Sequence, residues 1–263
     1  MNWNDLLPAL APITWFWLLL SAFLIGMGKA GIKGMGLIVV PLMAAVFGGK
    51  VSTGLVVPML VVADVFAVRH YNRHAQWNYL WKLLPAAVAG VLLGVWVGDR
   101  ISDELFDTLI AVFIISSLVL MLWQERSGLP PEVTGSWYFG TAFGLLGGFT
   151  TMIGNAAGPF MAVYLLSTRL PKNSFIGTGA WFFFLLNIFK VPFHVFVWET
   201  IDLASLKLDL LCIPFTALGI VIGVVAIASI GMAGAAIQQQ ATSNLGDLAS
   251  EVTVSAGEDS ETD

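Results

Sequence analysis

The stretch GMGKAGIKGMG at Gly26–Gly36 decides the fold class, because it interrupts an apolar segment with glycines and two lysines. A second interruption, GFTTMIGNAAGP at Gly148–Pro159, begins 122 residues later. Apolar segments that are interrupted at matching positions of two halves are typical of a transporter site built from broken helices. The two stretches therefore predict a membrane carrier with its site between the halves.

The composition also indicates a membrane protein, since 57% of the 263 residues are hydrophobic and 11% are charged, against about 25% charged in soluble domains. The apolar runs show no alternation of period two, so we expect an all-α polytopic protein rather than a barrel. We place it in the lipid bilayer of a bacterial plasma membrane. The nine expected apolar segments are Ile13–Met27, Gly34–Phe47, Val51–Val68, Leu80–Val97, Glu104–Trp123, Trp137–Phe149, Ala156–Ser167, Ser174–Val197 and Leu206–Ile230.

The chain divides into two related halves, because residues of the first recur in the second in the same order. The spacing is 122 for Gly26/Gly148 and Lys50/Lys172, 123 for Asp64/Asn187, and 129 for Pro85/Pro214, Gly90/Gly219 and Gly94/Gly223. We expect a first membrane repeat at 13–123, a linker at 124–135 and an incomplete second repeat at 136–230. Loop charges favour a re-entrant hairpin or two crossings for each glycine-rich pair. Each repeat then holds an odd number of segments, which predicts inverted repeats.

The second half has no counterpart of the apolar segment that ends at Trp123. Residues 231–263 contain six acidic residues and no basic one. They are too polar to cross lipid and too poor in apolar residues to fold alone, so we expect a disordered acidic tail. Two origins stay open: a natural tail, or a frameshift or truncation near Ala228 that removed a tenth segment.

The interruptions contain the residues that we expect to bind a substrate. Glycines let a backbone close on a ligand, and a helix N-terminus at a break attracts anions. The first stretch adds two lysines, four residues apart and on one face if the stretch is helical, whereas the second has uncharged donors at the same positions. This asymmetry favours a small oxyanion. The expected substrate-binding residues are Lys29, Gly31, Lys33, Gly34, Thr150, Thr151, Gly154 and Asn155.

Three polar residues inside apolar segments, Asp64, Asn187 and Lys190, are expected to line or gate the path. Lys190 lies about eight residues from the end of its segment, a depth at which a charge is costly and marks a pathway. A structural pair between Lys190 and Asp64 is the alternative. Asp64 itself could carry a coupling proton or pair with Lys190, but we favour an interfacial position beside Arg69.

Other classes of protein stay open as alternatives. Glycine spacings of this kind also serve close helix packing, which is compatible with a non-transporting membrane scaffold or assembly factor. A passive anion channel is the third class. The sequence contains no familiar catalytic motif and no cysteine–histidine metal spacing. We therefore expect no enzyme, no metal or other cofactor and no nucleic-acid partner.

Several motifs are shared with a known family. They are the glycine-rich break followed by IVVP, the segment FIGTGAWFFFLLNIFK at Phe175–Lys190, the WxxLxxLLP helix at Trp77–Pro85, and DVFAVRHYNR at Asp64–Arg73. Over about Leu18–Ile230 the chain resembles the TauE/SafE sulfite exporter family. The resemblance implies a secondary transporter that exports sulfite or organosulfonates, coupled to a proton or another ion. The polar C-terminus departs from the family pattern, which has a further span there. The exact substrate, the coupling ion, the direction and the oligomeric state stay open.

Overall fold

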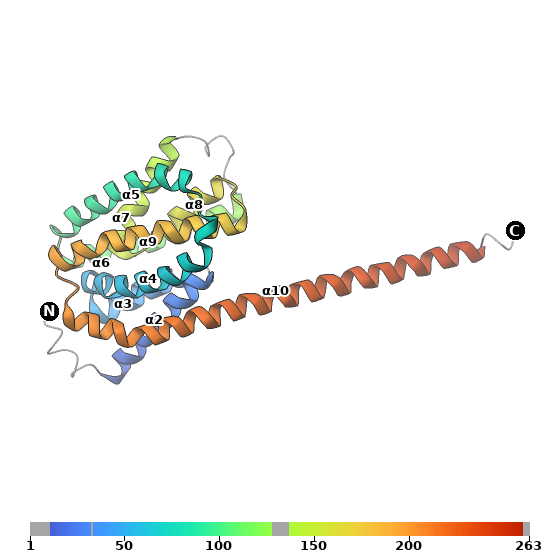
Figure 1. The fold of residues 1–263 in the computed structure, drawn as a ribbon, viewed down its shortest axis with the longest axis horizontal. Helices are drawn as coiled ribbons and strands as arrows, with labels where there is room; N and C mark the ends of the chain where they lie inside the picture. The colour runs from blue at the N-terminus through green and yellow to red at the C-terminus, as the bar shows by residue number, and fades with distance from the viewer. Residues whose placement is uncertain (1–10, 33, 128–136, 260–263) are drawn as a thin grey trace.

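The structure is a computed structural model that describes residues 11–32, 34–127 and 137–259, and Figure 1 shows a helical bundle from which one helix extends far outward. The described residues form nine α-helices and a short 3-10 helix, without a strand, which confirms the predicted all-α fold. The elements are α2 (Pro12–Ala30), α3 (Met35–Phe47), α4 (Gly49–Tyr71), η2 (Asn72–His74), α5 (Trp77–Gly98), α6 (Asp103–Ser127), α7 (Trp137–Gly154), α8 (Gly158–Ser167), α9 (Lys172–Phe196) and α10 (Leu203–Asp259).

Six of the described helices are long and apolar enough to cross a membrane, namely α2, α4, α5, α6, α9 and the part of α10 up to Gln240. Helices α3 and α8 have 13 and 10 residues, which at about 1.5 Å per residue gives about 20 and 15 Å. A bilayer core is about 30 Å thick, so these two helices reach only part of the way across. Each predicted apolar segment corresponds to one helix, and the chain is a multi-pass helical membrane protein.

The helices break within the two glycine-rich stretches. Helix α2 ends at Ala30, and the backbone then passes through Gly31 and Gly34 with φ of 120° and 85°. Glycine adopts these angles without the steric penalty of a Cβ atom. Helix α7 ends at Gly154, and Asn155 has a φ of 52°, in a region where asparagine is enriched among the other residues. In both halves a long helix thus ends and a shorter one begins at matching positions.

Helices α4 and α9 are equivalent elements of the two halves, and they pack against each other in opposite directions. Near the start of α4, Gly54 contacts Thr200, which follows α9. In the middle, Asp64 is hydrogen-bonded to Asn187. At the other end, Gly177 near the start of α9 contacts the C-terminal end of α4. Equivalent helices that run antiparallel are related by an axis that crosses them, so the repeats are inverted, as predicted.

The first helix of each half packs on the fourth helix of the other half, through glycines that the sequence repeats. A Cβ atom on Gly26 of α2 would collide with the carbonyl oxygen of Thr216 in α10. A Cβ atom on Gly148 of α7 would collide with the carbonyl oxygen of Ala87 in α5. Residues 87 and 216 are 129 apart, which is the spacing that the sequence predicts for α5 and α10. The two contacts are therefore the same contact made twice.

The partner glycines on the fourth helices repeat this reciprocity. Gly90 of α5 lies against the backbone of Leu145 and Phe149 in α7. Gly219 of α10 lies against the backbone of Phe23 and Met27 in α2, which are the residues 122 positions earlier. Close backbone contacts of this kind are how small residues let membrane helices approach. The core is accordingly built from both halves, with one apolar cluster mainly on α5 to α9 and another on α2, α3, α4 and α10.

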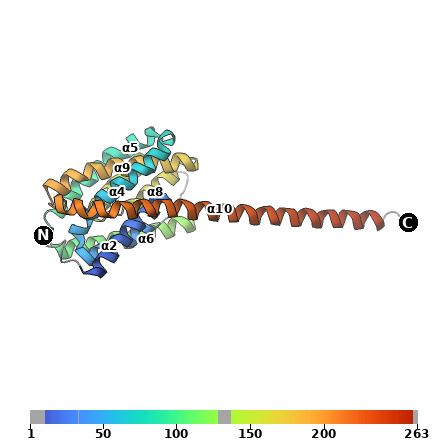
Figure 2. The same cartoon turned by 60° about the horizontal axis from the view of Figure 1, so that its bottom comes forward.

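Helix α10 does not end with the membrane segment. It continues without interruption to Asp259 and projects beyond the bundle, which both views show (Figures 1 and 2). Residues 231–240 are exposed. Up to Asp259 this differs from the disordered tail that we expected for 231–263, and residues 260–263 lie outside the described part of the chain. The run AGAAIQQQA is rich in strong helix formers, and it extends a helix that is already nucleated, so propagation requires no new nucleus.

Candidate functional site

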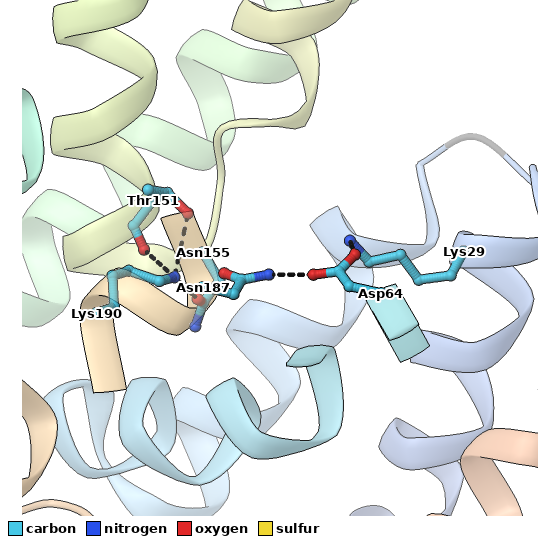
Figure 3. Close-up of polar contacts among 6 residues, drawn as sticks. All are labelled: Lys29, Asp64, Thr151, Asn155, Asn187 and Lys190. Carbon is cyan, nitrogen blue, oxygen red and sulfur yellow. Dashed lines mark hydrogen bonds and ion pairs between the residues drawn. The ribbon is translucent and has the colours of Figure 1, made fainter. Parts of the chain in front are cut away.

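Six polar residues from four helices meet between the two halves, and Figure 3 shows them as two adjoining groups. Their positions in the chain follow the repeat. The last turns of the two first helices contribute Lys29 of α2 and Thr151 of α7, and the break after α7 contributes Asn155; the two central helices contribute Asp64 of α4 and Asn187 and Lys190 of α9. All six are polar residues for which the sequence predicted a role in the site, and the structure brings them together.

Asp64 is the centre of the first group. Its side chain is 0% exposed, and its two oxygens accept from different partners. Oδ1 accepts from the Lys29 ammonium at 2.6 Å, and Oδ2 accepts from the Asn187 amide at 2.6 Å. The position that we favoured from the sequence, at the interface beside Arg69, is wrong. The reason is that Asp64 faces α2 and α9 rather than its own helix end.

Lys29 is the partly exposed member of this group and also contacts an aromatic ring of α9. Its side chain is 18% exposed, and its ammonium also lies 4.4 Å from the ring centroid of Phe183 in α9. An ammonium over an aromatic face gains a further attraction, which grows as the site is desolvated. Lys29 is therefore held by the carboxylate of its own half and by an aromatic ring of the other.

Lys190 is the centre of the second group. It is fully buried, and its ammonium donates to the Thr151 carbonyl at 3.0 Å, the Thr151 hydroxyl at 3.2 Å and the Asn155 side-chain oxygen at 2.7 Å. The Thr151 carbonyl belongs to the last turn of α7, where the helix dipole favours a cation. The alternative that paired Lys190 with Asp64 is not what the described residues form, since the ion pair of Asp64 is with Lys29.

Asn155 ties the second group to the first half. Its side-chain oxygen accepts from Lys190, and its amide donates to the carbonyl of Thr53 in α4 at 3.3 Å. The left-handed backbone at Asn155 ends α7 at this point. One residue thus breaks the helix, fixes a buried ammonium and contacts the opposite repeat.

The six residues carry two ammonium groups and one carboxylate, so their formal net charge is +1. Buried charges are costly unless they are paired. The carboxylate and Lys29 satisfy each other, but Lys190 is held only by neutral oxygen atoms among the described residues. An uncompensated buried cation with amide and hydroxyl groups beside it is suited to a small anion.

The remaining predicted site residues lie around this centre in different ways. Gly31 and Gly34 form the break after α2, and Gly154 is the buried last residue of α7. Thr150 is buried, but its hydroxyl donates to the carbonyl of Leu146 in its own helix, so its hydrogen bond serves the helix. Lys33 lies outside the described residues.

From the sequence we also expected the anion site at exposed helix N-termini, whereas the helix end that takes part is the C-terminus of α7, which binds a lysine. The sequence also led to no role for two buried ionisable groups. His194 lies one turn after Lys190, and its Nδ1 pairs with the Thr200 hydroxyl at 2.9 Å. Asp209 of α10 is buried, with no hydrogen-bond partner among the described residues. An acid inside an apolar run was the signal that could have pointed to Asp209.

Fold and site together define a polytopic helical membrane protein with inverted repeats and a positively charged polar cluster between them. The family model described as "Sulfite exporter TauE/SafE" matches residues 18–237 of this chain. The chain belongs to this family, as the sequence motifs suggested, and the family is one of exporters rather than enzymes. Searches of the curated proteins and of the solved structures gave no match.

Proposed function

We propose that the protein is a secondary transporter that exports a small sulfur oxyanion, sulfite or an organosulfonate, across a bacterial plasma membrane. The observation that carries the proposal is a second buried lysine between two inverted repeats, Lys190, which has no carboxylate partner among the described residues. Membership of a sulfite exporter family supports the same class of substrate.

In this proposal the anion lies between the two groups of Figure 3. Lys29 and Lys190 supply charge, while Asn155, Asn187 and the Thr151 hydroxyl supply directional hydrogen bonds. Hydrogen bonds from charged donors to oxyanions are about twice as strong as neutral ones. A sulfur oxyanion offers several acceptor oxygens, which suits donors that converge from four helices.

The contacts at the two ends of α4 and α9 support an alternating-access mechanism. At one end Gly54 receives Thr200, and at the other end Gly177 receives the segment after α4. The two glycines are 123 residues apart, so these are equivalent contacts on opposite sides of the site. We infer that each acts as a gate, and that rocking one repeat against the other opens one gate while the other stays closed.

The test is efflux of radiolabelled sulfite from proteoliposomes. Lys190→Met removes the buried charge at similar side-chain length, and a lost charge-assisted hydrogen bond costs about 1.5–3 kcal/mol. Since about 1.4 kcal/mol is a factor of ten, we expect efflux to fall at least about tenfold. The control is Lys82→Met, which changes an exposed lysine of α5 and is expected to leave efflux unchanged.

Undiminished efflux in a folded Lys190→Met protein would contradict the site. Absence of saturable sulfite flux in the wild-type protein would favour the two other classes. A scaffold gives no flux at all in liposomes, whereas a passive channel gives conductance that does not saturate at low sulfite concentration.

A further inference from the structure

We propose that Asp64 is the coupling-proton site of the transporter: it holds Lys29 while the anion site is empty, and it takes up one proton when an anion binds there. This inference rests on the proposed anion transport. It identifies the coupling ion as a proton and predicts its stoichiometry as one proton for each anion.

The geometry makes Asp64 a competitor of the substrate. The Lys29 ammonium is the partly exposed cation of the cluster, and its 2.6 Å contact with Asp64 Oδ1 uses its charge. An anion that reaches Lys29 meets a cation that a protein carboxylate already neutralises. Substrate and Asp64 therefore compete for the same ammonium group.

Displaced from Lys29, an ionised Asp64 would keep one hydrogen bond, from Asn187 to Oδ2. Its side chain is 0% exposed, so water does not replace the lost partner. Leaving a buried charge unpaired costs several kcal/mol, and such a group is neutralised instead. A proton from water that binds Oδ1 removes this cost, while Oδ2 still accepts from Asn187.

Among the described residues, Asp64 has few charged neighbours, which makes this step specific. Lys29 approaches from α2 and Lys190 from α9, and the neutral amide of Asn187, also in α9, donates to Asp64. Helices α3 and α7 contain no charged residue. In α6, Asp107 lies beside Gly49, about 22 Å along α4 from Asp64 at about 1.5 Å per residue. In α10, Asp209 is buried without a hydrogen-bond partner among the described residues, and Lys207 is exposed.

The inverted repeat explains why there is one such proton site rather than two. The residue equivalent to Asp64 is Asn187, and the two side chains meet where α4 and α9 cross. An amide has the shape of a carboxyl group but does not ionise. A duplicated pair thus became one acid and one permanent donor, so that a singly charged anion and one proton together move no net charge.

The experiment follows protons and anions together in proteoliposomes that contain a pH-sensitive dye. A gradient of sulfite is applied at mildly acidic pH, where nearly all of it is singly charged hydrogensulfite, and protein-free liposomes supply the blank. For the wild-type protein we expect one proton to move with each anion in the same direction. The flux is also expected to be insensitive to an imposed membrane potential.

In Asp64→Asn, the exchange of labelled for unlabelled hydrogensulfite that remains is expected to occur without proton movement, which falls to the blank. Protons that hydrogensulfite itself binds or releases contribute equally for both proteins. The difference in proton flux between the wild-type protein and Asp64→Asn therefore measures the proton that Asp64 carries. Asp209→Asn is the matched control, because it removes another buried carboxylate, and it is expected to keep both fluxes.

Proton movement that survives in Asp64→Asn would overturn the inference, as would wild-type anion flux that carries no proton or responds to the membrane potential. Loss of proton movement in Asp209→Asn alone would assign the proton to α10 instead. If the wild-type protein exchanges no hydrogensulfite, the proposed function itself fails, and the coupling inference fails with it. If Asp64→Asn does not fold, the inference is tested on the wild-type protein alone. One proton per anion and a flux insensitive to the membrane potential support it, and any other result overturns it.

Discussion

The two repeats share their packing and differ in their chemistry. Gly26 of α2 and Gly148 of α7 make the same backbone contact with the opposite half. Three residues after each of these glycines, the first repeat has Lys29, which binds a carboxylate, and the second has Thr151, which accepts from a lysine of another helix. Backbone contacts thus restrain both copies of a duplicated unit, while side chains at the shared interface are free to diverge.

The largest effect is expected from the shared contacts. Gly148→Val forces a branched side chain against the Ala87 carbonyl, and backbone atoms cannot move aside as side chains can. We expect no folded protein. Gly148→Ala and Gly26→Ala should each lose about 3 kcal/mol or more, at the upper end of overpacking penalties. Thermal melting in detergent measures the loss.

The matched control for these substitutions is Gly36→Ala in α3, where a Cβ atom would meet nothing within 4 Å. It should melt at the wild-type temperature or slightly higher, because alanine is the better helix former. Widely different melting temperatures of Gly26→Ala and Gly148→Ala would contradict the equivalence of the two contacts.

A smaller effect distinguishes the two lysines of the site. Lys29→Met leaves Asp64 buried and unpaired, and we expect a loss of about 2–3 kcal/mol, below the 3–5 kcal/mol of fully buried pairs because Lys29 is partly exposed. In the Lys29→Met/Asp64→Asn double variant much of this loss should disappear. The coupling free energy, about 1–3 kcal/mol, is obtained from denaturation of the four proteins in a double-mutant cycle.

The corresponding cycle in the second half joins Lys190→Met with Asn155→Gly, where glycine keeps the left-handed backbone. Its coupling is expected to be smaller, because Asn155 is neutral and Lys190 retains two contacts with Thr151. An equal or larger coupling there would show that charge is not what separates the two repeats.

The smallest effect is expected from Thr151→Val. This change removes the hydroxyl that contacts Lys190 at 3.2 Å but keeps the carbonyl that contacts it at 3.0 Å. One net hydrogen bond contributes about 0.5–1.5 kcal/mol, so the KM for sulfite should rise about two- to tenfold. Thr150→Val serves as the control and should leave KM unchanged, because the Thr150 hydroxyl bonds within its own helix.

The features that the sequence predicted correctly depend on spacing and hydropathy. The offsets of 122, 123 and 129 residues correspond to the reciprocal contacts of Gly26 and Gly148, and to the antiparallel crossing of Asp64 and Asn187. The length of each apolar run predicted a helix, and the depth of Lys190 within such a run singled out this lysine. These properties are periodic or compositional, so one sequence is sufficient to recognise them.

The features that were missed depend on contacts between distant residues. Lys29 and Asp64 are 35 residues apart, and no local rule joins them, whereas Arg69 lies nearby in the chain and suggested the wrong partner. The same limit applies to Asn155 and the Thr53 carbonyl, 102 residues away. The helical tail was missed for another reason, because composition describes whether a segment can fold alone and not whether it continues a helix that exists.

The continuity of α10 has a mechanical consequence. Its 29 residues beyond Ile230 span about 44 Å at about 1.5 Å per residue, and they belong to the same rod whose inner part packs on α2 through Gly219. A small rotation of α10 against α2 is therefore magnified at the far end, as by a lever arm. A spin label on the outermost turns would turn ångström-scale rearrangements of the bundle into large changes of distance.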